Sequence, residues 1–377
     1  MQSVFRLLPF SRSSVERLHI YSFPSLRELF SRTYSIPIDQ FTTPNLAHLA
    51  LEQGDYQQNM TVQILLDMLR GFPLLETLLI TGSGVRRNST RDHSPVSLPH
   101  LRSIEFGAYE VGSGLTTHLQ FPPNVAAGFR ALPFSDICGD IPLEIVAAIQ
   151  HVLRRVDIHS ITLAVPFDTR EGVELLIRFE GLLGSLEVTI HGVNTNAQFW
   201  DVFFGTGGML FSHSPRIENV RELHMTSCPF VDGRGMDHIN AAMPNLVSIS
   251  FFFCEGPHLY GLLAPANPSS PPFPHLKRVM WLSPELRLIS MAKTRRDHGV
   301  PLKTLVVGRL PRGSGLDYYE RGRLEDYTAL EELVEDLRVG CPTEILEWGT
   351  ENEILNVWST GGIPGPVSPD AKLVVPG

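Results

Sequence analysis

The sequence has few cysteines and no long hydrophobic run. Its four cysteines, Cys138, Cys228, Cys254 and Cys341, form no CxxC motif and no Cys/His cluster at zinc spacing. We therefore expect buried, reduced thiols in a reducing compartment. No run of about 18 or more apolar residues occurs, which argues against a membrane-spanning helix. The first twenty residues also lack the apolar stretch of a secretory signal. These absences predict an intracellular protein, cytoplasmic or nuclear, that spans no membrane.

The sequence is also short of positive charge. It has 31 Lys and Arg against 40 Asp and Glu, which gives a formal net charge of −9. Proteins that bind nucleic acid need a basic surface to neutralise phosphates. The charge balance therefore predicts that nucleic acid is not a partner.

Familiar catalytic motifs are missing as well. There is no HExxH, GxxxxGK(S/T), GxSxG or EF-hand loop. None of the fourteen histidines has a second histidine four positions away together with a carboxylate on a convincing helix. Acidic pairs such as Glu331-Glu332 are typical of a solvated helix face. We therefore expect no catalytic site, no metal and no cofactor.

The sequence does contain a recurring apolar triplet, in which an apolar residue is followed by others three and five positions later. The triplets begin at Val15, Leu46, Leu75, Leu101, Phe129, Ile158, Leu183, Val220, Leu246, Leu276 and Leu302. Successive first residues are 25 to 37 positions apart. A proline stands two positions before five of them, at Pro44, Pro73, Pro99, Pro244 and Pro274. This spacing predicts one short strand per triplet.

The stretches between the triplets have apolar residues at helical spacing. The predicted helices cover residues 60–72, 142–156, 169–183, 196–205, 284–299 and 324–338, and a last strand is predicted at 344–348. Proline suits the return from helix to strand, because it lacks a backbone donor and keeps the preceding residue out of a helix. One such unit is too small to fold alone, so we expect the units to stack.

A step of about 20–29 residues with LxxLxL strands resembles a leucine-rich repeat. The stretches FTTPNLAHLALEQGDYQQ and LEDYTALEELVEDLRVGCPTEILEW also resemble the F-box-associated leucine-rich-repeat proteins of mushroom-forming fungi. Most units lack the asparagine or cysteine usual after the strand, which favours an irregular, helix-containing subtype. The resemblance implies an α/β leucine-rich-repeat solenoid, a curved parallel sheet lined by helices, with about 11–12 irregular repeats.

Three regions follow from this interpretation. We expect an N-terminal extension over residues 1–12, the solenoid over 13–360 and a flexible C-terminal tail over 361–377, which is rich in proline and glycine. No F-box is seen in the sequence.

In such a solenoid the residues that alternate with the apolar ones face the concave side. The predicted binding residues there are Arg17, His19, Tyr21, His48, Glu52, Glu105, Glu222, His224, Phe252, Arg278 and Met280. We expect a monomeric, non-enzymatic scaffold that binds another protein. By resemblance, that partner is a ubiquitin-ligase component or client. The alternative is an α/β enzyme with no recognisable catalytic motif, although a closed barrel would have about eight strand–helix units rather than eleven.

Overall fold

The structure is a computed structural model. It describes residues 4–6, 21–22, 27–32, 41–42, 44–52, 61–82, 85, 94–107, 111, 114–133, 143–164, 173–193, 217–226, 228, 233–252, 254, 272–282, 288–308 and 324–340. The elements in these ranges are, in chain order, β1 (Val4–Arg6), β2 (Tyr21–Ser22), β3 (Glu28–Arg32), β4 (Phe41–Thr42), β5 (His48–Glu52), α1 (Val62–Arg70), β6 (Thr77–Thr81), β7 (Val96–Ser97), β8 (Ser103–Gly107), η2 (Leu115–His118), β9 (Leu119–Gln120), β10 (Ala126–Pro133), α3 (Leu143–Leu153), β11 (Ile158–Ala164), β12 (Val173–Gly181), β13 (Ser185–Val193), η3 (Ile217–Asn219), β14 (Glu222–Thr226), α5 (Gly233–Ala242), β15 (Ser248–Phe252), β16 (Arg278–Leu282), α7 (Leu288–Asp297), β17 (Thr304–Gly308), α8 (Leu324–Glu331) and β18 (Asp336–Gly340).

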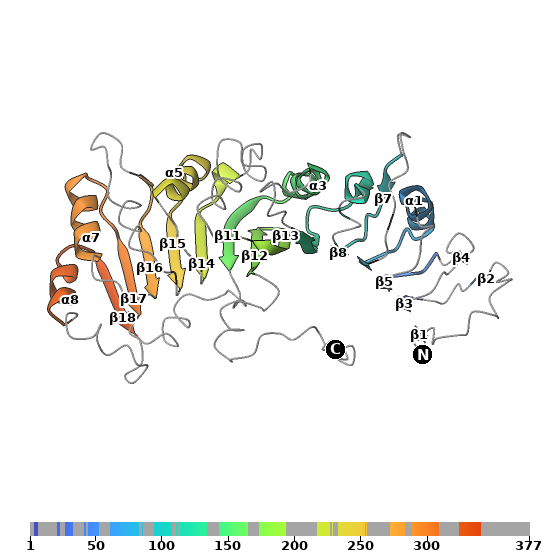
Figure 1. Ribbon diagram of the computed structural model, residues 1–377, viewed down its shortest axis with the longest axis horizontal. Coiled ribbons are helices and arrows are strands. Elements are labelled where there is room, and N and C mark those ends of the chain that lie inside the picture. The colour runs from blue at the N-terminus through green and yellow to red at the C-terminus, as the bar shows by residue number, and fades with distance from the viewer. Residues whose placement is uncertain are drawn as a thin grey trace.

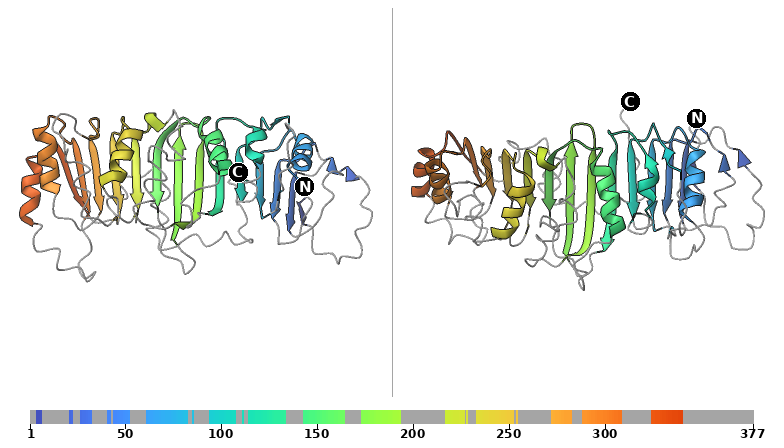
Figure 2. Two further views of the ribbon diagram at one scale, coloured as in Figure 1. Left: turned by 45° about the horizontal axis from the view of Figure 1, so that its top comes forward. Right: turned by 90° about the horizontal axis from the view of Figure 1, so that it is seen from above.

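Fourteen of these strands form one open sheet. Their order is β1-β3-β5-β6-β8-β10-β13-β12-β11-β14-β15-β16-β17-β18. Neighbouring strands are parallel, except that β12 is antiparallel to both β11 and β13. Figures 1 and 2 show the strands side by side along the long axis of the molecule. The fold is therefore α/β with a large, mostly parallel, open sheet, as predicted at this coarse level.

A line of apolar residues crosses the sheet in register. The residues at matching Cα positions on successive strands are Leu29, Leu49, Leu78, Ile104, Ala127, Leu186, Phe179, Ile161, Leu223, Ile249, Val279, Leu305 and Leu337. All are buried except Leu337, which is partly buried and packs against the same core. A second apolar line follows two residues later on the parallel strands from β5 to β18, and two residues earlier, at Ile177, on the antiparallel β12. Because side chains alternate between the faces of a strand, both lines lie on one face.

The predicted triplets supply most of this apolar layer. Their second and third residues occupy the two lines on β5, β6, β8, β11, β13, β14, β15, β16 and β17. The segments that begin at Leu46, Leu101, Leu246 and Leu276 thus lead into parallel strands of a single sheet, as predicted.

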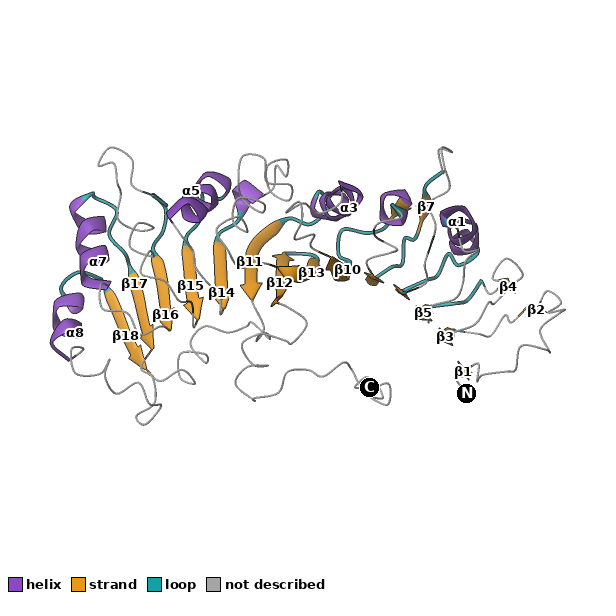
Figure 3. Ribbon diagram, viewed as in Figure 1, coloured by secondary structure: helices purple, strands orange, loops and turns teal. Residues whose placement is uncertain are grey.

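The described helices lie against the apolar face only, along the outer side of a curve (Figures 1 and 3). Helix α1 begins after Thr61, whose hydroxyl accepts the N–H of Ile64 at 3.3 Å. It buries Val62, Leu65 and Leu69 against the strands. Helices α1, α3 and α7 lie within the ranges predicted at 60–72, 142–156 and 284–299. Helix α5 was not predicted.

A β-turn explains the recurring prolines. At Pro73, Pro99, Pro244 and Pro274, the N–H of the leucine two residues later donates to the carbonyl of the residue before the proline, at 3.0–3.2 Å. Both the leucine and the residue before the proline are buried in each case. The fixed φ of proline suits this second position of a turn. Proline therefore shapes the entry to the strand, and among the described elements a helix ends shortly before it at Pro73 and Pro244.

Backbone hydrogen bonds at the strand starts tie neighbouring strands together. The carbonyl of Arg27 accepts the N–H groups of Ala47 and His48, both at 2.9 Å. The same double acceptance recurs at the carbonyls of Ala47, Glu76, Arg221, Val247 and Lys277. This repeated arrangement keeps successive parallel strands in one register.

The middle of the sheet departs from the predicted order. Strands β11, β12 and β13 form an antiparallel meander, yet β13 lies beside β10 and β11 lies beside β14. The prediction of a helix over 169–183 is wrong, because this segment contains strand β12. Its buried residues Leu175, Ile177 and Phe179 alternate with half-buried ones, which is the period of a strand. Leu183, predicted to begin a buried triplet, is 64% exposed in the turn between β12 and β13.

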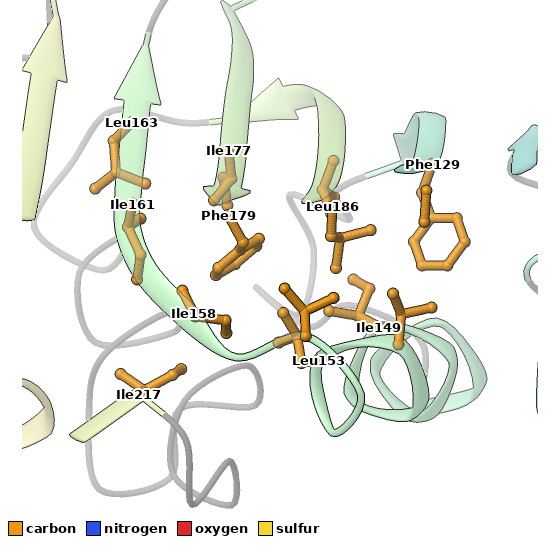
Figure 4. Close-up of a cluster of buried hydrophobic side chains, with 14 of the residues drawn as sticks. Phe129, Ile149, Leu153, Ile158, Ile161, Leu163, Ile177, Phe179, Leu186 and Ile217 are labelled. Atoms are coloured by element: carbon orange, nitrogen blue, oxygen red, sulfur yellow. The ribbon is translucent and has the colours of Figure 1, made fainter. Parts of the chain in front are cut away.

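That turn is held tightly by its surroundings. The N–H of Gly181 donates to the carbonyl of Gly184 at 2.8 Å. A Cβ added at Gly184 would lie 2.5 Å from the carbonyl oxygen of Pro123, so a side chain does not fit there. Helix α3 packs against these strands, and Figure 4 shows its Ile149 and Leu153 close to Leu186 and Phe179.

Two other predictions differ in position. Phe129, predicted to begin a triplet, pairs with Phe106 and so takes the third position, while Ala127 takes the middle one. The predicted helix 324–338 is also too long, since α8 ends at Glu331 and β18 follows.

The predicted N-terminal extension, residues 1–12, contains strand β1, which pairs with β3. Other predicted segments cannot be compared with the structure. The triplet at Val15, the helix 196–205, the strand 344–348 and the tail 361–377 lie outside the described residues.

Candidate binding face

The other face of the sheet, which we call the front face, carries no helix in the part of the chain that the structure describes. Two rows of residues, which alternate with the apolar lines, form most of it. In sheet order the first row is Glu28, His48, Thr77, Ser103, Ala126, Ser185, Glu180, Ser160, Glu222, Ser248, Arg278, Thr304 and Asp336. The second row, from β5 onward, is Ala50, Leu79, Glu105, Gly128, Glu187, Arg178, Thr162, His224, Ser250, Met280, Val306 and Arg338. Polar and charged residues predominate in both.

The structure gathers most of the predicted site residues on this face. Those on the front face are His48, Glu105, Glu222, His224, Phe252, Arg278 and Met280. Glu52 belongs to β5. Tyr21 does not join the main sheet, because its strand β2 pairs only with β4. Arg17 and His19 lie outside the described residues.

Charge pairs occupy the centre of the front face. Arg178 on β12 lies 2.7 Å from Glu187 on β13 and 4.0 Å from Glu180. Arg130 on β10 lies 2.8 Å from Glu105 on β8. Sequence reasoning missed Arg178 and Glu180 because it assigned their segment to a helix. Such partly exposed pairs add little stability, but they leave a pattern of charge that a partner can read.

Beside these pairs, β11 and β14 carry buried polar groups without partners. The hydroxyls of Ser160, Thr162 and Thr226 belong to residues that are 2%, 4% and 3% exposed, and none makes a hydrogen bond. The Nδ1 atoms of His224 and His159 are also buried without a hydrogen-bond partner. We call this group, together with Glu222, the polar strip. It consists of His159, Ser160, Thr162, Glu222, His224 and Thr226.

Charge at one end of the polar strip is set by Glu222. The Nε2 atom of His224 lies 3.6 Å from its Oε2 atom. This imidazole lowers the pKa of the Glu222 carboxyl, burial opposes the effect, and the charges of His159 and Arg278 lower the pKa further. The carboxyl is therefore ionised at neutral pH. Arg278 stands in the same row two strands away, so the two opposite charges flank Ser248.

The front face becomes apolar toward β17. Phe252, Met280 and Val306 point to this side, and they are only 2%, 3% and 1% exposed. Phe252 and Met280 therefore differ from the exposed anchors that the sequence predicts. The alternation of residues along a strand predicts which face of the sheet a side chain lies on, but it does not predict how exposed that side chain is. The burial of these residues was therefore not predictable from the pattern.

Two buried thiols lie just beyond the strands. The Sγ atom of Cys228 donates to the carbonyl of Leu163 at 3.5 Å, and that of Cys254 donates to the carbonyl of Met225 at 3.4 Å. Each thus bonds the preceding strand of the sheet from the same relative position. The contact with Cys254, followed by burial, raises the pKa of the Cys228 thiol. Cys228 is therefore protonated at neutral pH and is a poor nucleophile.

Two further features were not found among the described residues. No three His, Cys, Asp or Glu side chains there are grouped so that they could hold a metal ion. No helix among the described residues has the length and apolar character needed to cross a membrane.

The sequence was compared with protein-family models and with curated proteins. No protein-family model matches the sequence, and no curated protein is significantly similar to it.

Proposed function

We propose that this protein is a non-enzymatic leucine-rich-repeat scaffold that binds another protein through its front face. The observation that carries the proposal is the one-sided sheet. On the strands from β3 to β18 most front-face residues are polar or charged, with an apolar part toward β17, while the described helices lie only on the other side. An extended sheet of this kind offers a large surface for a partner.

Three recurring features support the leucine-rich-repeat interpretation, with about 11–12 irregular repeats. Apolar residues hold the same positions on successive strands, a turn with proline precedes several strands, and strand-start carbonyls accept two N–H groups. Cys228 and Cys254 add support, since each follows its strand where such repeats place asparagine or cysteine and binds a carbonyl of the preceding strand.

By resemblance to F-box-associated proteins, the partner class is a ubiquitin-ligase component or one of its clients. This partner class rests on the resemblance alone. It is tested by identifying the proteins that bind the chain, whereas the binding face is tested separately with variants.

Affinity purification with mass spectrometry tests the proposal. The front-face variant combines Arg130→Glu with Arg278→Glu, and the control combines Arg154→Glu with Lys293→Glu, which are exposed residues of α7 and of the turn after α3. Both variants change the net charge equally. We expect a defined set of proteins to be captured by the wild type and the control and to be lost from the front-face variant. Equal capture by both variants would reject the front face as the binding site.

A further inference from the structure

Two leucines form the tip of the turn between β12 and β13. Leu182 is 76% exposed and Leu183 is 64% exposed, which makes them the most exposed large hydrophobic side chains among the described residues. Short turns of this kind usually carry glycine, asparagine or aspartate, and neither leucine belongs to the core. We call the pair the leucine tip. Two large apolar side chains exposed together point to a surface that another molecule covers.

The leucine tip has a fixed position, because the glycines on either side of it pack tightly. A Cβ added at Gly181 would lie 2.6 Å from the Cγ1 atom of Val156. A Cβ added at Gly184 would lie 2.5 Å from a backbone carbonyl oxygen in the segment 122–125. The tip therefore sits between that segment and the turn at 154–157. All three precede strands that run in the same direction, β13, β10 and β11, so they share one edge of the sheet.

Basic residues gather beside the leucine tip. Arg154 is exposed. The guanidinium of Arg155 lies 4.7 Å from the centre of the Phe121 ring and donates to the Phe121 carbonyl at 3.1 Å. The imidazole of His151 lies within reach of the charges of both arginines and of His118. We call these two arginines and two histidines the basic cluster.

The charge of this edge is positive, although the chain as a whole has a formal net charge of −9. Neither arginine of the basic cluster forms an ion pair with a described residue. Burial lowers the pKa of His151, so this histidine is neutral at neutral pH and the arginines supply the charge. Glu180, next to the tip, belongs to the front face and lies 4.0 Å from Arg178. Asp157 is the one carboxylate in the three segments at this edge, residues 118–125, 154–157 and 181–184.

We propose that this edge of the sheet binds a membrane surface that contains anionic phospholipids. The leucine tip enters the headgroup region, and Arg154 and Arg155 contact lipid phosphates there. Binding of this kind stays at the interface and needs no spanning helix.

A bilayer fits both features of this edge better than other partners do. Lipid accepts an exposed apolar side chain without a matching pocket, and each basic residue near an anionic surface adds attraction. A soluble anion would pair with the arginines and leave the leucines exposed. A second copy of the chain would need an interface of about 1,200 Å² or more, far beyond the area of two leucines. Stable attachment to a membrane takes two weak signals together, and this edge combines an apolar one with an electrostatic one.

Co-sedimentation of the full-length chain with extruded vesicles tests the proposal. One set of vesicles contains phosphatidylcholine and phosphatidylserine in a two-to-one ratio, and the other contains phosphatidylcholine alone. We expect the wild type to bind the mixed vesicles about tenfold more tightly, because only these attract the arginines. Added salt should weaken this binding, because it screens the attraction.

Variants of the leucine tip test the apolar contact. Leu182→Ser/Leu183→Ser should bind the mixed vesicles about tenfold or more weakly than the wild type, because the apolar side chains are lost. Ile64→Ser, at a 41% exposed position on α1, is the control and should bind as the wild type does. Both variants replace exposed side chains, so both should unfold at the temperature of the wild type.

Two charge variants with the same net charge separate this edge from the front face. Arg154→Glu/Lys293→Glu should bind the mixed vesicles about tenfold more weakly and still capture the proteins that bind the front face. Arg130→Glu/Arg278→Glu should lose those proteins and still bind the vesicles. The membrane proposal is therefore independent of the proposed function, and either can fail alone.

Four results would each overturn the membrane proposal. They are no binding of the wild type to the mixed vesicles, equal binding to both kinds of vesicle, unchanged binding of the leucine variant, and equal loss of binding in the two charge variants. Loss of a captured protein from the leucine variant, without any vesicle binding by the wild type, would assign the tip to a pocket in a protein instead.

Discussion

Arg295 holds the backbone of the turn that leads into strand β16. Its side chain, fully buried in α7, donates to the carbonyls of Pro272 and Phe273 at 3.0 Å and of Leu276 at 3.3 Å. Phe273 has a φ of 49°, a left-handed conformation that is rare outside glycine. Burial lowers the pKa of Arg295 to about 10, which leaves it charged at neutral pH. The guanidinium therefore compensates for a strained backbone.

Replacement of Arg295 should destabilise the folded protein. We expect Arg295→Met to lower the free energy of unfolding by about 3 kcal/mol, because three buried carbonyls lose their donor. Lysine cannot reproduce the planar fork, so Arg295→Lys should recover less than half of the loss. Urea denaturation measures both. Lys293→Met, at an exposed position of α7, is the control. A loss for Arg295→Met no greater than that of the control would contradict this role.

His151 provides a prediction about pH. It lies on α3, and its Nε2 atom donates to the carbonyl of Leu119 at 3.2 Å. Burial lowers the pKa of His151, with smaller contributions from Arg155 and Arg154. The unfolded chain therefore binds more protons at this residue, and its contribution to stability is lost as pH falls below the unfolded pKa of about 6.5.

We expect the wild type to lose more stability between pH 7 and pH 5 than His151→Gln, which keeps a donor but does not titrate. The difference should be less than about 1.4 kcal/mol per pH unit, the limit for one proton. Urea denaturation across this pH range gives the comparison. Parallel pH profiles for the two proteins would show that His151 is not responsible.

Among the elements, the triplet rule predicts a strand well where three apolar residues follow a proline turn. It succeeds at β5, β6, β8, β15 and β16, where alternation and turn chemistry agree. It misses β3, in which Ser31 takes the third position. It also misses β18, although Val334, Leu337 and Val339 have the required spacing, because helical periodicity extends across the same residues.

Strand β12 shows the limit of reading a short apolar segment. Residues 173–181 contain Leu175, Ile177 and Phe179 at alternate positions, yet Leu176 also allows a helical interpretation. The reversed order of β11 and β13 depends on contacts between distant segments, which local periodicity does not encode. For the same reason, only part of the front face could be predicted from the sequence. His224, Glu222 and Arg278 lie opposite the helices, as alternation along the strands predicts, but Arg178 and the unpaired hydroxyls were not predicted.

The turn between β12 and β13 gives a prediction for this element. We expect Gly184→Ala to destabilise the protein by about 1–3 kcal/mol, because its Cβ would collide with backbone carbonyls at Pro123 and Val125. Gly128→Ala is the matched control, since its nearest contact is the side chain of Glu105 at 3.4 Å. Thermal unfolding distinguishes them. Equal unfolding temperatures for the two variants would argue against the tight packing of this turn.

At the scale of the whole molecule, the front face exists only if the sheet is continuous. The apolar line passes from Ala127 through Leu186, Phe179 and Ile161 to Leu223, so the meander joins the two parallel halves without a break. This order brings the charge pairs of β12 and β13 next to the polar strip. In chain order, β13 would instead lie beside β14, and the composition of the face would change.

Engineered disulfides test this continuity most directly. Ala126 on β10 and Ser185 on β13 are Cα partners, at the neighbouring-strand spacing of about 4.8 Å that a disulfide can bridge. Ser185 and Glu222 are separated by β12 and β11, or about 14 Å. Mass spectrometry after oxidation should therefore find the cross-link in Ala126→Cys/Ser185→Cys and none in Ser185→Cys/Glu222→Cys. The opposite result, with Ser185→Cys linked to Glu222→Cys, would contradict a continuous sheet in this order.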